Sequence, residues 1–85
     1  MYSIEFDKSV KKTLSKLPNE VIKKILDAIA ELAEDARTNG CKKLQSSEDY
    51  YRIKVGNYRV IYEINDGELL ILVVEIGHRK EVYKR

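Results

Sequence analysis

Four stretches of the chain have the pattern of β-strands. In residues 2–6, apolar side chains alternate with polar ones, which predicts a strand with one buried face. Residues 49–55 and 58–64 are rich in β-branched and aromatic residues, and residues 69–76 are apolar at most positions. A strand that is apolar on both faces is typical of the middle of a sheet. We therefore expect residues 69–76 to lie centrally, with the N-terminal strand beside them.

The segment between the first two strands has apolar residues at helical spacing. Asp7 can cap a first helix, in which apolar residues recur from Val10 to Leu17. Pro18 lacks a backbone N–H, so it ends this helix after Leu17 and suits the first turn of a second helix. The second helix is expected to end at residues 38–40, which are Thr, Asn and Gly. Its predicted apolar side consists of Val21, Ile22, Ile25, Leu26, Ile29, Leu32 and Ala33.

These elements predict an α+β fold in a single domain over residues 1–85. Their order is a strand, a two-helix hairpin and a three-strand antiparallel meander, followed by a short C-terminal segment. A helix hairpin with one apolar side needs a sheet to cover that side. We therefore expect a four-stranded sheet packed on the two helices.

The two-residue turn Gly56-Asn57 sets the register between the second and third strands, with Gly at the position that needs a positive φ. In this register Lys54 faces Arg59. Directly opposed cations destabilise a sheet, so folding gives no reason to keep this pair, whereas a bound anion does. The alternative is that these charges only keep the strand soluble and discourage edge pairing. The predicted core face is Tyr51, Ile53, Val55, Tyr58, Val60 and Tyr62, and the predicted outer face is Tyr50, Arg52, Lys54, Arg59, Ile61 and Glu63.

Composition narrows the chemistry that the chain can carry. The chain has 85 residues with one Cys and one His, so it has no internal disulfide and no metal site built from thiolate and imidazole alone. A chain this short buries only about 60–65% of its unfolded surface, which points to a site on an open face. We find no leader pattern, and the longest apolar run, residues 69–74, is far shorter than a membrane span. We therefore expect a cytoplasmic protein with no membrane partner.

Charge is unevenly distributed along the chain, although the formal net charge is only +2. Residues 41–60 carry an excess of basic side chains, residues 61–75 carry only acidic ones, and residues 76–85 are basic again. If the fold brings the two basic segments together, they form an anion-binding site. The second segment contains His78, an alternative acid or base because histidine titrates near neutral pH. A lone exposed histidine is, however, more often inert than catalytic.

Two motifs in these segments resemble the RelE branch of the RelE/ParE toxin superfamily. The first is DYYRIKVGNYRVIY at residues 49–62, and the second is GHRKEVY at residues 77–83. The order of the predicted elements also resembles this family, so the likeness covers essentially the whole chain. The resemblance implies the toxin of a type II toxin–antitoxin system. It further implies a ribosome-dependent endoribonuclease that cleaves messenger RNA in the A site with the ribose 2′-hydroxyl as nucleophile, without a metal or other cofactor.

The resemblance also implies catalytic roles for individual residues. Lys54 is expected to act as general base or charge stabiliser, and Arg59 to hold the scissile phosphate. Arg79 is expected to stabilise the transition state or to assist the leaving oxygen. Tyr83 is expected to stack on, orient or deprotonate the nucleotide.

Further residues are expected to bind RNA. Arg52 stands where some family members have a lysine, and we interpret it as a phosphate contact because arginine holds a fixed charge. Tyr50 and Lys80 complete the predicted RNA-binding set. Some relatives use a carboxylate base, for which Glu63 is a weak candidate.

Two other functions stay open at this point. A ParE-like toxin that poisons DNA gyrase needs no catalytic residues, and it has no need of a phosphate-directed set of side chains. A plain RNA-binding module fits the basic face and Tyr50, but the chain lacks a tandem aromatic platform for stacking bases. The expected partners are the ribosome, messenger RNA and a cognate antitoxin. A partly disordered antitoxin can wrap the domain, displacing its C-terminal segment or covering its basic face.

Overall fold

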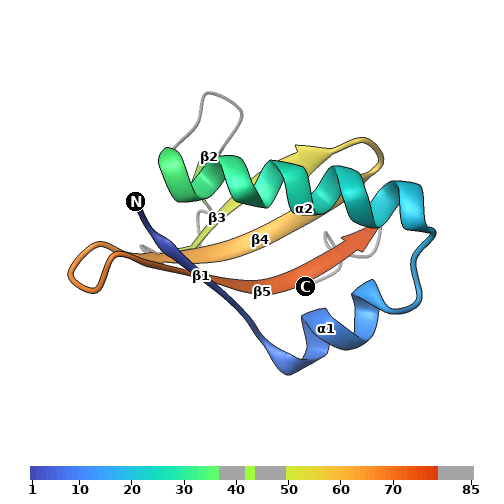
Figure 1. The fold of residues 1–85 in the computed structure, drawn as a ribbon, viewed down its shortest axis with the longest axis horizontal. Helices are drawn as coiled ribbons and strands as arrows, with labels where there is room; N and C mark the ends of the chain where they lie inside the picture. The colour runs from blue at the N-terminus through green and yellow to red at the C-terminus, as the bar shows by residue number, and fades with distance from the viewer. Residues whose placement is uncertain (37–41, 44–49, 79–85) are drawn as a thin grey trace.

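The computed structural model describes residues 1–36, 42–43 and 50–78, with residues 42–43 described by their backbone alone. Within these ranges the elements are β1 (Ser3–Phe6), α1 (Lys8–Leu14), α2 (Asn19–Glu34), β2 (Lys42–Lys43), β3 (Tyr50–Val55), β4 (Tyr58–Asn65) and β5 (Leu70–His78). The strands form one mixed sheet in the order β1-β5-β4-β3-β2. β1 runs parallel to β5, and the other neighbouring strands are antiparallel. Helix α2 lies across one face of this sheet (Figure 1).

The predicted α+β fold is confirmed, including the position of β1 beside the apolar strand β5. The sheet differs from the prediction by one short strand. β2 pairs with β3 and extends the four predicted strands to five. A strand of two residues has no periodic pattern that sequence reasoning can detect.

Helix α1 begins as predicted and ends earlier. The Asp7 side chain accepts hydrogen bonds from the Ser9 hydroxyl at 2.6 Å and from the Ser9 backbone N–H at 3.3 Å, which caps the helix. The hydroxyl hydrogen bond is the main reason that the pKa of Asp7 lies below its ordinary value. The helix ends at Leu14, and a tight turn follows in which the N–H of Leu17 donates to the carbonyl of Leu14 at 3.1 Å. Pro18 explains this early end, because it has no N–H to donate to the Leu14 carbonyl four residues earlier and its ring would clash with that carbonyl in a continued α-helix.

Helix α2 also ends before the predicted position. Pro18 is its N-cap, one position before the first turn in which the sequence places it. The helix stops at Glu34, and Asp35 is already extended. Ala36 is then buried, and its carbonyl accepts a hydrogen bond of 3.0 Å from the Tyr62 hydroxyl. The local sequence would allow a further helical turn, but this tertiary contact takes its place. The prediction that Leu26 lies on the buried side is wrong, since Leu26 is 41% exposed.

The β3–β4 hairpin has the predicted register at all six pairs, from Tyr50 with Glu63 to Val55 with Tyr58. Gly56 has φ +62°, which confirms its role in the turn. The predicted core face is confirmed as well: all six of its residues belong to the core between sheet and helices or pack against it. Tyr62 is fully buried there, and its ring stacks on that of Tyr51 with centroids 6.0 Å apart. No helix in the described ranges is both long and apolar enough to cross a membrane.

Candidate functional site

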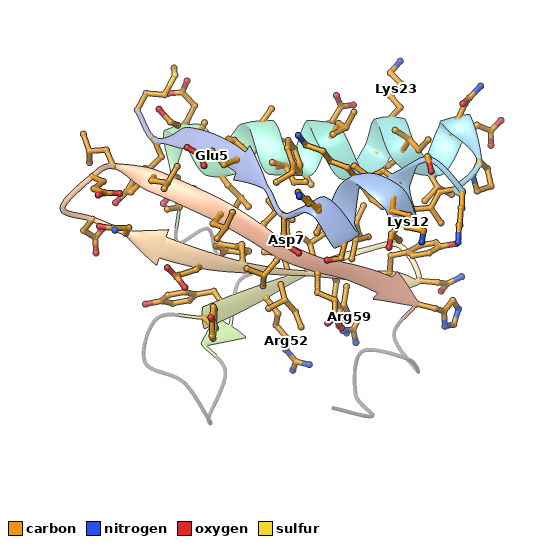
Figure 2. All side chains as sticks on the ribbon, turned by 90° about the horizontal axis from the view of Figure 1, so that it is seen from below. Glu5, Asp7, Lys12, Lys23, Arg52 and Arg59 are labelled. Carbon is orange, nitrogen blue, oxygen red and sulfur yellow. The ribbon has the colours of Figure 1, made fainter. Side chains whose placement is uncertain are left out.

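The sheet face that points away from the helices carries a group of cations. Lys54 on β3 and Arg59 on β4 are direct register partners, so the prediction that they face each other is confirmed. Arg52 lies two residues before Lys54 on β3 and therefore shares its face. Figure 2 shows Arg52 and Arg59 pointing away from the helices on the same side of the sheet. We call Arg52, Lys54 and Arg59 the basic face.

The three cations of the basic face differ in exposure. Lys54 is exposed and Arg52 is half-buried. Arg59 is only 4% exposed and is the one charged side chain that is buried in the described part of the chain. The predicted outer face is therefore not exposed to solvent at Arg59. Arg59 has a strand partner on each side, Lys54 and Gly77, whereas β2 pairs with β3 only at Tyr51 and Arg52 and does not reach Lys54.

The short strand β2 places the backbone of a basic residue next to the basic face. Lys42 is the register partner of Arg52, so its backbone extends the row of basic residues to the β2 edge of the sheet. Sequence reasoning counted Lys42 in a basic segment but did not assign it to the site. Only the pairing of β2 with β3 in the sheet brings Lys42 beside Arg52, ten residues further along the chain.

His78 lies on the opposite face of the sheet from the basic face. It is the register partner of Tyr58, a residue of the core face. The rings of His78 and Tyr58 meet edge to face, with centroids 5.8 Å apart. The structure therefore does not bring His78 together with Arg59, although the two residues are near in register.

A β-bulge determines which side chains of β5 reach the basic face. Ile61 pairs with Glu75, whereas Tyr62 pairs with Val73, so β5 has one extra residue at this point. Uninterrupted alternation from the buried Val73 places residue 75 in the core and residue 78 on the outer face. The bulge reverses both assignments. Glu75 reaches the outer face, and His78 turns toward the helices.

Glu75 is a residue of this face that sequence reasoning missed. It is half-buried and directly opposite Ile61, which lies between Arg59 and Glu63 on β4. Because Gly77 is the register partner of Arg59, Glu75 is the diagonal neighbour of Arg59. One signal could have found it: Glu75 is the only charged residue in the apolar stretch 69–76.

The other predicted residues lie further away or outside the described ranges. Tyr50 is the register partner of Glu63, so both share the outer face, four residues along their strands from the Lys54 and Arg59 pair. Arg79, Lys80 and Tyr83 lie outside the described residues, and the convergence of the two basic segments stays a prediction. In the described part of the chain, no group of three or more His, Cys, Asp and Glu side chains is placed to hold a metal ion.

Comparison with known proteins identifies the family. A family model described as the ParE toxin of type II toxin–antitoxin systems matches residues 4–83. The chain belongs to this family of toxins. The toxin is 31% identical to a putative RelE1 toxin of Methanocaldococcus jannaschii, in an alignment that covers 98% of the chain and 96% of that relative. It is 35% identical to toxin RelE3 of the same organism, over 92% of the chain and 91% of the relative.

Solved structures agree with this assignment. The toxin superimposes on a chain of the intact E. coli RelBE toxin–antitoxin complex with a TM-score of 0.82 and 28% identity, covering 92% of the toxin and 96% of that chain. It superimposes on the isolated E. coli RelE toxin with the same TM-score and 27% identity, covering 100% and 98%. The resemblance to RelE that the two motifs indicated is therefore confirmed, and the chain is a RelE-type toxin of a toxin–antitoxin system.

The geometry of the toxin's basic face suits a phosphate group. Arginine presents a planar fork of donors that matches phosphate oxygens, and lysine adds a compact mobile charge. Arg59 is fixed by burial, whereas Lys54 is exposed and free to move toward a substrate atom. A fixed anchor beside a mobile cation is an arrangement that can bind a phosphodiester and stabilise additional negative charge on it.

Proposed function

We propose that this toxin is a metal-independent endoribonuclease that cleaves messenger RNA in the ribosomal A site. The observation that supports it most is the direct opposition of Lys54 and Arg59 beside the β3–β4 turn. Two opposed cations weaken a sheet by a few tenths of a kcal/mol to about 1 kcal/mol. A phosphodiester between them relieves this repulsion, so the pair has a reason to exist in a protein that binds RNA.

The reaction is an in-line displacement at phosphorus. The ribose 2′-oxygen loses its proton and forms a bond to phosphorus, while the bond to the 5′-oxygen breaks and that oxygen gains a proton. The products are a 2′,3′-cyclic phosphate and a free 5′-hydroxyl. Arg59 holds the phosphate, and Lys54 removes the proton or stabilises the charge that develops on the phosphate oxygens. Arg79 and Tyr83 assist the leaving oxygen and orient the nucleotide.

The ribosome supplies the alignment that this site lacks. An in-line attack requires the nucleophile, phosphorus and leaving oxygen to be held in one geometry, and such positioning contributes about 7–11 kcal/mol to catalysis. Lys54 is exposed at the end of a hairpin, and a mobile cation on a sheet surface does not by itself impose this geometry. We therefore expect cleavage on translating ribosomes and very little on free RNA.

A small antitoxin is the expected inhibitor. Solved relatives include the RelE–RelB complex of Pyrococcus horikoshii and the RelB–RelE complex of Methanococcus jannaschii, which are 28% and 32% identical to this toxin. By analogy, the product of a neighbouring reading frame binds this toxin and covers its basic face. Exposed ion pairs contribute only about 0–1 kcal/mol each, so the antitoxin segment needs apolar anchors as well as acidic side chains.

Inhibition of DNA gyrase is the second candidate function, because the matching family model carries the ParE name. Brief induction of the toxin in cells, followed by mapping of transcript ends and of DNA breaks, separates the two functions. New transcript ends inside translated regions support cleavage of messenger RNA. Double-strand DNA breaks without such ends support gyrase poisoning, and a plain RNA-binding module produces neither.

Purified toxin gives the direct test. Programmed ribosomes and the same transcript without ribosomes are incubated with wild-type toxin, with Lys54→Gln and with the control Lys23→Gln. Both lysines are exposed, but Lys23 lies on α2, on the far side of the molecule from the basic face (Figure 2). We expect Lys54→Gln to lose about 100-fold or more in cleavage rate, the usual range for a general base or a charge-stabilising donor. Full activity of Lys54→Gln, or equal cleavage of free and ribosome-bound transcript, contradicts the proposal.

A further inference from the structure

We propose that Glu75 is a positioning residue that holds the Arg59 guanidinium in the orientation that receives the scissile phosphate. This inference rests on the function proposed above. It deepens that function by placing a carboxylate in a site whose other described members are cations.

Strand register places Glu75 close to Arg59. Arg59 pairs with Gly77 and Ile61 pairs with Glu75, so Glu75 and Arg59 are diagonal neighbours on one face of adjacent strands. Diagonal neighbours in an antiparallel pair lie about 7–8 Å apart, within reach of long side chains. Glutamate and arginine are both long enough to meet across this distance.

Burial gives Arg59 a need for such a carboxylate. Its side chain is 4% exposed, and a buried charge is stable only when an opposite charge and hydrogen bonds compensate for lost water. Three glutamates lie on the described strands of the outer face, namely Glu5, Glu63 and Glu75. Glu63 is four residues from Arg59 on the same strand, and Glu5 lies on β1, two strands from β4. Among these three, Glu75 alone is a neighbour of Arg59.

Glu75 is also closer to Arg59 than to the other cations of the basic face. Arg52 shares a row with Glu75, but the buried Ile61 separates them. Lys54 lies on β3, so β4 stands between it and Glu75. Arg59 is therefore the cation of the basic face that Glu75 reaches across a single strand spacing.

A carboxylate on one edge of the guanidinium leaves the other edge for the substrate. Arginine has five N–H donors in a fixed fork, so it can bind Glu75 and a phosphate at the same time. The carboxylate restricts rotation of the fork before RNA arrives. A misplacement of about 1 Å in such a group can reduce the reaction rate about 100-fold. The bulge that turns Glu75 outward thus helps to set the orientation of the Arg59 guanidinium.

The first experiment tests the contact between Glu75 and Arg59 without measuring activity. Proton exchange at the two Nη groups of Arg59 is followed by ¹⁵N-edited NMR of arginine side chains, with the signals assigned through Arg59→Lys. We expect exchange to accelerate severalfold in Glu75→Gln and to stay unchanged in Glu5→Gln, an exposed carboxylate that strand register also places on the outer face. Unchanged exchange in Glu75→Gln overturns the proposal, whether or not the toxin cleaves RNA.

The second experiment tests the coupling in the ribosome assay. All variants are compared at a temperature at which circular dichroism shows them folded. We expect Glu75→Gln to lower the cleavage rate about 10- to 100-fold with little change in the toxin concentration needed for half-maximal rate, and Glu75→Asp to retain more activity. In the Arg59→Lys background the same change should have almost no further effect, because the fork that Glu75 orients is gone. The proposal is overturned if the two changes lower the cleavage rate independently in the double variant, or if Glu75→Gln cleaves faster than wild type. Absence of cleavage in wild-type toxin refutes the proposed function instead. The exchange measurement then still shows whether Glu75 holds Arg59.

Discussion

Replacing Lys54 with glutamine should make the protein more stable while it removes activity. Lys54 and Arg59 are directly opposed across the β3–β4 hairpin, and neutralising one of them removes a repulsion between like charges. Lys54 is exposed, so glutamine leaves no cavity and buries no new polar group. The change therefore isolates the electrostatic cost of the site from packing.

The expected gain follows from the spacing of the pair. Opposed Cβ atoms lie about 5 Å apart, and two unit charges at about 5 Å in a medium like water repel by about 0.8 kcal/mol, or about 0.4 kcal/mol at about 10 Å. The Lys54 ammonium can swing outward, which favours the lower value, whereas burial of Arg59 lowers the local dielectric constant and favours the higher one. A gain of about 0.3–1 kcal/mol corresponds to a rise in Tm of roughly 1–8 °C for a domain of this size.

Urea unfolding and thermal melts at low and high salt check this prediction. The gain should shrink in 1 M salt, where the screening length is only about 3 Å. Lys23→Gln is the matched control, since Lys23 is an exposed lysine on α2, and it should change stability by less than about 0.5 kcal/mol. A loss of stability in Lys54→Gln at low salt, or a gain that is insensitive to salt, would refute the reasoning.

Three further predictions concern the fold. Tyr62→Phe leaves a buried carbonyl at the end of α2 without its 3.0 Å hydrogen bond and should cost about 1–3 kcal/mol in urea unfolding; a loss no larger than that of Tyr58→Phe contradicts this. Leu69 has φ +51° and is 50% exposed, so Leu69→Gly should stabilise by about 0.5–1 kcal/mol after the entropy cost of glycine. Leu69→Ala keeps the strain, and an equal gain from it would contradict this explanation. The pKa of Asp7 is lowered in the folded state by a serine hydroxyl, so its stabilisation is present above the unfolded pKa of about 3.9 and is lost as pH falls through the folded value. Asp7→Asn should therefore lose less Tm than wild type on acidification, and parallel Tm curves would contradict this.

Local turn and cap chemistry explains what the sequence predicts well. The two-residue turn at Gly56 leaves a single register for the hairpin, so the facing of Lys54 and Arg59 follows from the sequence alone. Asp7 likewise caps α1 by accepting a hydrogen bond from the backbone N–H of Ser9, only two positions away. In both cases the interacting groups are near in sequence, so local chemistry is enough to predict them.

Contacts between distant segments explain what the sequence does not predict. The end of α2 is set by the buried carbonyl of Ala36, which binds Tyr62 from β4, and no local signal encodes that partner. The pairing of Lys42 with Arg52 depends in the same way on β2 lying beside β3 in the assembled sheet. Burial of Arg59 depends on the position of β4 inside the sheet. Each of these features requires the assembled sheet.

The bulge in β5 shows why a functional face is harder to predict than a core. Residues 69–74 can fill a core in either phase, because they are apolar throughout. Only Glu75 distinguishes the two phases, since the phase without a bulge would bury its charge. The choice matters only for the polar residues at the end of the strand. One phase presents His78 beside the cations, and the bulged phase presents Glu75 there and places His78 against Tyr58. A one-residue change in pairing thus exchanges an imidazole for a carboxylate next to Arg59, and within residues 69–76 the charge of Glu75 is the one feature of the sequence that indicates which phase was selected.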